Sequence, residues 1–83
     1  MVSGRATQIV EGRFIGSMTD DFFPIERLFG TLEEAQERAA SFLVNHRMAG
    51  ARHWQAGAED YNGTVWYAHA REITIRIRQG NER

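Results

Sequence analysis

The stretch Thr31–Gly50, TLEEAQERAASFLVNHRMAG, decides the fold because it contains the clearest helical pattern in the sequence. Thr31 and Glu34 form a capping box, in which each side chain bonds a backbone N–H that the first helical turn leaves unpaired. Apolar residues then recur every three or four positions and form a stripe that we expect to be buried: Leu32, Ala35, Ala39, Phe42, Leu43 and His46, widened by Val44 and Met48. Gly50 follows this stripe as a stop signal. The sequence therefore predicts a helix over about 32–49.

Beyond this helix the apolar period changes to two, which indicates strands. We predict strands over 52–56, 64–70 and 72–79, with a polar loop over 57–63 between the first two. The last strand alternates cleanly between core-facing and outward-facing side chains: Ile73, Ile75 and Ile77 against Thr74, Arg76 and Arg78. The pattern does not decide whether Ala70 and Arg71 form a tight turn or a bulge within one long strand.

Two shorter patterns precede the helix. Residues 6–15 are rich in β-branched and aromatic side chains and predict a strand, in which Gly12 indicates a bulge or a close approach to the backbone. Residues 25–29 predict a second strand that forms a hairpin with the first. Alternation divides the second strand between two faces: Ile25 and Phe29 on one, Glu26 and Leu28 on the other.

In chain order these elements are two strands, one helix and three strands. They predict a single domain over residues 1–83 with an α+β fold, in which one helix packs on one face of an antiparallel, four- to five-stranded sheet. The tail 80–83 should fray. The other face of the sheet is then open to water or to a partner.

The composition excludes several classes of function. The chain has no cysteine, which excludes disulfides, zinc fingers of the Cys type and thiol catalysis. Ten basic residues, all of them Arg, and eleven acidic residues give a net charge of −1, which disfavours a phosphate-driven nucleic-acid binder. We find neither a secretory signal nor an apolar run of the roughly 20 residues that a membrane-spanning helix needs. We therefore expect a protein of the cytoplasm that does not bind membranes.

The sequence contains no motif for catalysis, for a cofactor or for a metal. The three histidines are too scattered for a helical metal pair, and no serine lies in a nucleophile elbow. We therefore predict no enzyme, no catalytic residue, no cofactor and no metal. One alternative stays open, because His53 and His69 lie on neighbouring predicted strands. In a homodimer of packed sheets they could line a pocket with Trp54 and Tyr67, as in a small enzyme or ligand-binding domain.

Aromatic and basic side chains are the candidates for binding a partner. Trp66 and Tyr67 must lie on opposite faces of their strand, so at least one large ring faces away from the helix. Arg76 and Arg78 share the outward side of the last strand, where charge reversal should weaken binding and leave the melting temperature nearly unchanged. The predicted partner-binding residues are Trp54, Trp66, Tyr67, Arg52, Arg71, Arg76 and Arg78. The alternative is a solvated polar face that only keeps the sheet soluble.

The order of these signals resembles that of small orphan proteins of bacteriophages and other mobile elements, among them certain small anti-CRISPR proteins. The residues that carry the resemblance are Thr31–Ala35, Trp54, Gly63–Ala68 and Ile73–Ile77. The resemblance implies a non-enzymatic, phage-encoded inhibitor that occupies a site on a larger protein or ribonucleoprotein complex, such as a host defence complex that processes nucleic acids. It carries over no functional residue. Direct binding of nucleic acid is a weaker alternative.

Overall fold

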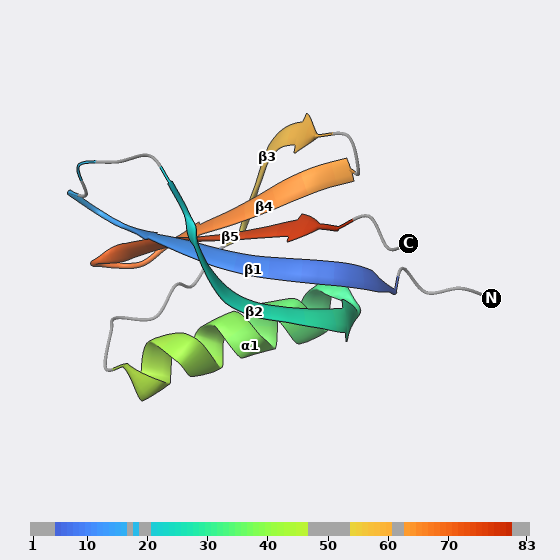
Figure 1. The fold of residues 1–83 in the computed structure, drawn as a ribbon, viewed down its shortest axis with the longest axis horizontal. Helices are drawn as coiled ribbons and strands as arrows, with labels where there is room; N and C mark the ends of the chain where they lie inside the picture. The colour runs from blue at the N-terminus through green and yellow to red at the C-terminus, as the bar shows by residue number, and fades with distance from the viewer. Residues whose placement is uncertain (1–4, 17, 19–20, 47–53, 61–62, 81–83) are drawn as a thin grey trace.

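The structure is a computed structural model, and it describes residues 5–16, 18, 21–46, 54–60 and 63–80 (Figure 1). Within these residues it contains five strands and one helix: β1 (Ala6–Phe14), β2 (Phe23–Gly30), α1 (Leu32–Asn45), β3 (Gln55–Asp60), β4 (Gly63–His69) and β5 (Ile73–Gln79). The strands form one antiparallel sheet in the order β2-β1-β5-β4-β3. The predicted α+β fold, with a single helix packed on the sheet, is confirmed.

The start of α1 is the predicted capping box. The Thr31 hydroxyl accepts a hydrogen bond from the Glu34 backbone N–H at 3.2 Å, and the Glu34 carboxylate accepts one from the Thr31 N–H at 2.8 Å. The helix ends at Asn45, with His46 as its C-cap, so the predicted end near residue 49 is wrong. The Phe42 carbonyl accepts the His46 backbone N–H at 3.1 Å and also a hydrogen bond from Nδ1 of His46 at 3.0 Å. Gly50 lies outside the described residues.

The core lies between α1 and one face of the sheet. Ala35, Ala39 and Leu43 of the helix pack on Val10 and on the three isoleucines of β5, as the apolar stripe predicts. Val44 does not belong to that stripe: it is 72% exposed, because it lies on a side of α1 that faces away from the sheet. Gly12 permits close packing, since a Cβ at this position would lie 2.9 Å from side-chain carbons of Ile25 and Ile73.

Three features of the strands differ from the prediction or complete it. The pairing of β1 with β2 shifts register between Val10 and Glu11, so Ile25 and Leu28 both pack on the core and Phe29 is exposed. The predicted faces of β2 are therefore wrong. Strand β3 continues to Asp60, through residues predicted to be a loop. Ala70 donates its N–H to the Ile73 carbonyl at 2.9 Å, so Arg71 and Glu72 form a tight turn.

The helix covers the sheet unevenly. It contacts β2, β1 and β5, and Figure 1 shows it running along that half of the sheet. The opposite side of the same strands is covered by no described helix or strand. We call this side the open face.

Candidate functional site

Strand alternation and register place three rows of side chains across the open face. The first row holds Arg27 of β2, Ile9 of β1 and Arg78 of β5. The second row holds Glu11 of β1, Arg76 of β5 and Tyr67 of β4. The third row holds Arg13 of β1, Thr74 of β5 and His69 of β4. These rows bring together residues from both ends of the sequence.

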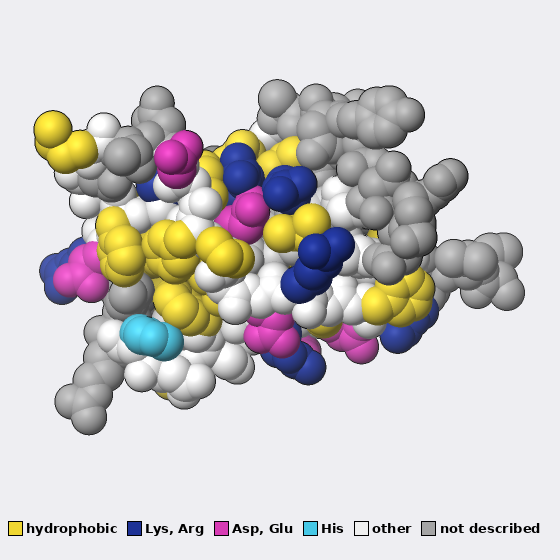
Figure 2. All heavy atoms as spheres, viewed as in Figure 1, with side chains coloured by type: hydrophobic (Ala, Val, Ile, Leu, Met, Phe, Trp, Pro, Cys, Tyr) yellow, Lys and Arg dark blue, Asp and Glu magenta, His cyan; other side chains and the backbone are white. Residues whose placement is uncertain are grey.

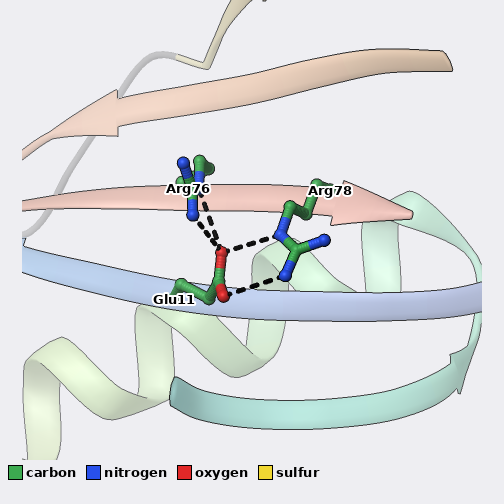
Figure 3. Close-up of polar contacts among 3 residues, drawn as sticks. All are labelled: Glu11, Arg76 and Arg78. Atoms are coloured by element: carbon green, nitrogen blue, oxygen red, sulfur yellow. Dashed lines mark hydrogen bonds and ion pairs between the residues drawn. The ribbon is translucent and has the colours of Figure 1, made fainter. Parts of the chain in front are cut away.

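Glu11 lies at the centre of this face and binds two arginines (Figure 3). Arg76 donates from Nε at 3.0 Å and from Nη2 at 2.6 Å, both to Oε1 of the carboxylate. Arg78 donates from Nε to Oε1 at 2.9 Å and from Nη2 to Oε2 at 3.2 Å. Figure 3 shows both guanidinium groups turned toward the carboxylate from β5, with α1 behind the strands. The two arginines are therefore fixed in place by one acid.

Burial and charge act in opposite directions on Glu11. The residue is only 8% exposed, and burial by itself raises the pKa of a carboxyl group because the charged form loses its hydration. The hydrogen bonds and charges of Arg78 and Arg76 outweigh burial, so the pKa of Glu11 lies below its usual value of 4.5. Glu11 is therefore ionised at neutral pH, and the cluster carries one more positive charge than negative.

Phe22 packs on one end of the cluster. The guanidinium carbon of Arg76 lies 3.9 Å from the centroid of the Phe22 ring, and that of Arg13 lies 5.7 Å from it. Both distances allow an attraction between a cation and the face of the ring. Phe22 precedes β2, so the connection between β1 and β2 helps to hold these arginines in place.

Charges of opposite sign gather on opposite sides of the molecule. Strand register places Arg13, Arg27, Arg76 and Arg78 on the open face, together with Glu11 of β1. The helix side holds four acids, of which Glu26 is paired with Arg38 and Glu34 lies 4.0 Å from Arg5; the others are Glu33 and Glu37. Figure 2 shows dark blue side chains around a magenta one in its upper half, and mixed magenta and blue along the lower edge, where Figure 1 places α1. A net charge near zero therefore does not exclude that the open face is basic.

Large hydrophobic side chains are exposed where β1 runs into its connection with β2. Ile15 is 58% exposed and Met18 is 98% exposed. Phe14 is also exposed and stacks on Phe23, with ring centroids 5.3 Å apart. We call Phe14, Ile15 and Met18 the apolar tip. In sequence, Ile15 follows Arg13 by two positions, so the tip adjoins the third row of the open face.

The structure divides the predicted binding residues between two sides. Trp66 pairs with Ile77 and packs against the core, while Tyr67 pairs with Arg76 on the open face, as alternation predicts. Trp54 also packs against the core. Both tryptophans therefore lie on the side of the sheet opposite Arg76 and Arg78. Arg71 is exposed in the turn between β4 and β5, and Arg52 lies outside the described residues.

The alternative pocket is not assembled on one face. Trp54 packs on the helix side and Tyr67 lies on the open face, so the sheet separates them. His53 lies outside the described residues, and Nδ1 of His69 lies 3.1 Å from the Thr74 hydroxyl. In the part of the chain that the structure describes, no three His, Asp or Glu side chains are close enough to hold a metal ion. The same part contains no helix that is long and apolar enough to span a membrane.

Sequence reasoning missed four residues of the open face. Glu11, Arg13, Arg27 and Phe22 were assigned no role, although Glu11 and Arg13 share one parity of the first strand. Residues two positions apart in a strand point to the same face, so the sequence does indicate that Glu11 and Arg13 share a face. It does not indicate the pairing of β1 with β5, which brings Glu11 to Arg76. Comparisons with protein-family models, with curated proteins and with solved structures gave no match for this chain.

Proposed function

We propose that this chain is a non-enzymatic binding domain that engages a partner protein through its open face. The observation that carries the proposal is the segregation of charge: four arginines surround one glutamate on a sheet face that no described element covers. Arginine is suited to such a role, because its planar group forms directional pairs with carboxylates and is weakly hydrated. Exposed aliphatic side chains at the adjoining apolar tip add surface that a partner can bury.

Two arginines of this face are already oriented before any partner binds. The bonds to Glu11 hold Arg76 and Arg78, and Phe22 packs on Arg76. Less side-chain entropy is then lost on binding, which favours affinity. Arg27 is exposed on the neighbouring strand, so a partner can meet it directly.

Inhibition of a larger complex is one action that such a domain would have. It is the action that the resemblance to small anti-CRISPR proteins implies, and it follows if the open face occupies a site that the complex uses. We therefore propose inhibition as the consequence of binding. Addition of the purified chain to a complex that it captures, followed by an assay of that complex, measures this directly.

Matched charge reversals on the two sides of the molecule test the proposed surface. Arg27→Glu changes the open face, and Arg38→Glu makes the same change in net charge on α1. We expect a partner captured from a bacterial lysate by the wild-type chain to be retained by Arg38→Glu and lost by Arg27→Glu. Equal capture by all three proteins, each shown by circular dichroism to be folded, would rule out the open face.

A further inference from the structure

We infer that the partner of the open face is an acidic polypeptide segment that also carries apolar side chains, and that Glu11 selects against nucleic acid. This inference rests on the proposed function and adds the chemistry of the partner. It is carried by three features of the described residues: the arginine rows, the apolar tip beside them, and the carboxylate at their centre.

The arginine rows define the charge of the partner. Arg27 and Arg78 flank Ile9 in one row, and Arg13 lies diagonally across from Arg76. Neighbouring strands lie about 4.8 Å apart, so the guanidinium groups on β2, β1 and β5 are spread over a width of roughly 10 Å. Carboxylates on one side of an extended or helical peptide can reach groups spaced in this way. Complementary charge steers such a segment to the face and fixes its orientation.

The apolar tip distinguishes a polypeptide from a nucleic acid. Ile15, two positions after Arg13, and the exposed Met18 offer aliphatic surface at the apolar tip, and Ile9 adds an aliphatic side chain between Arg27 and Arg78. Leu, Ile or Met side chains of a peptide can bury this surface, whereas a sugar–phosphate backbone has no aliphatic counterpart. The face of the Phe22 ring is occupied by Arg76 at 3.9 Å, so this ring is not a free platform on which a base can stack.

Glu11 determines specificity by its position. The bonds of Glu11 to Arg76 and Arg78 offset one of their two positive charges, which lowers the attraction of this face for a continuous phosphate chain. A peptide can place an acid against the exposed Arg27 and leave a neutral residue over Glu11. Glu11 therefore favours spaced negative charges over continuous ones.

Direct binding of synthetic probes tests the inference. The probes are a labelled peptide of Glu-Glu-Leu repeats, the same peptide with Gln for Glu, and a single-stranded oligonucleotide of equal charge, each followed by fluorescence anisotropy at low salt. We expect the acidic peptide to bind the wild-type chain at least tenfold more tightly than either other probe. Arg27→Glu should weaken that binding about five- to tenfold, because it replaces an attractive charge by a repulsive one; a factor of ten corresponds to about 1.4 kcal/mol. Arg38→Glu should leave the binding unchanged.

The outcomes separate this inference from the proposed function. An oligonucleotide that binds as tightly as the acidic peptide overturns the inference. The open face keeps its role as the binding surface if Arg27→Glu also weakens the binding of the oligonucleotide. An acidic peptide that binds no better than its Gln counterpart also overturns it. If the acidic peptide binds but is insensitive to Arg27→Glu, the proposed face itself is wrong. Glu11→Gln is the specificity variant, and it should narrow the gap between peptide and oligonucleotide.

Discussion

At the scale of single residues, Glu11 holds two arginines in place, and we propose that it also affects recognition. It is buried, and it is compensated by two arginines that lie on one neighbouring strand. Removing Glu11 takes the shared acid from two half-buried arginines, and removing an arginine leaves the buried Glu11 with less compensation; either is more harmful than losing an exposed ion pair. The sequence-based expectation that Arg76 and Arg78 affect binding but not stability therefore loses its premise: the Arg76 side chain is only 25% exposed and bonds Glu11.

The first prediction concerns the stability of this cluster. Glu11→Gln removes the charge but keeps the size of the side chain, and it should lower the free energy of unfolding by about 1–3 kcal/mol. Glu37→Gln is the matched control, because Glu37 is exposed on α1 and its change should stay within about 0.5 kcal/mol. Urea denaturation of the three proteins measures both. Equal effects of the two changes would show that the cluster contributes nothing to stability.

The second prediction concerns pH. The pKa of Glu11 in the folded chain is lower than its usual value of 4.5, which we take for the unfolded chain. Its contribution to stability is then complete above about pH 4.5 and is lost as the pH falls through the folded value. The difference in unfolding free energy between the wild type and Glu11→Gln should be constant near neutral pH and shrink in acid. A difference that stays constant or grows in acid contradicts the ion-pair account.

At the scale of elements, the ends and faces of helices and strands could be predicted only where they depend on residues close together in the sequence. The start of α1 was predictable because the capping box is a contact between residues three positions apart. The end was not, because the apolar period continues to residue 48 while the His46 side chain bonds the last turn. The faces of β2 were not predictable either, since the bulge at Ile25 arises from pairing with β1. Likewise, nothing local indicates that β5 lies beside β1, and this pairing assembles the Glu11 cluster.

The third prediction concerns the cap of α1. Thr31→Ala removes the acceptor for the Glu34 N–H and should lower the free energy of unfolding by about 1 kcal/mol. Thr31→Ser keeps the hydroxyl and should restore most of that loss. Thermal and urea denaturation provide the measurement. If Ser were no better than Ala, the effect would come from the lost methyl group and not from the cap.

The fourth prediction compares two neighbouring residues of the helix. Leu43 is buried against the sheet, so Leu43→Ala should leave a cavity and lower stability by roughly 2–4 kcal/mol. Val44 is exposed, and Val44→Ala should change stability by less than about 0.5 kcal/mol. Denaturation midpoints of both variants decide the point. Similar losses at the two positions would mean that α1 is rotated relative to the sheet.

At the scale of the whole molecule, uneven covering of the sheet and segregation of charge act together. The helix buries the side of the sheet that carries the isoleucines and leaves the arginine side open. Association of two copies through their open faces would bring the four arginines that register places on each face together, around two copies of Glu11. Like charges at an interface oppose such packing. The homodimer of packed sheets, considered from the sequence, is therefore disfavoured for this surface.

The last prediction follows from that repulsion. Any pairing of two open faces should weaken as salt is lowered, because the Debye length increases from about 8 Å at physiological ionic strength to about 30 Å at 0.01 M. Binding of an acidic peptide should strengthen over the same range, since opposite charges are then screened less. Sedimentation of the free chain and anisotropy of the labelled peptide, both followed across this range of salt, give the two trends. If lowering the salt instead drove the chain into dimers that Arg27→Glu abolishes, the open face would bind a second copy of this chain. The acidic surface that it binds would then be the helix side of that copy.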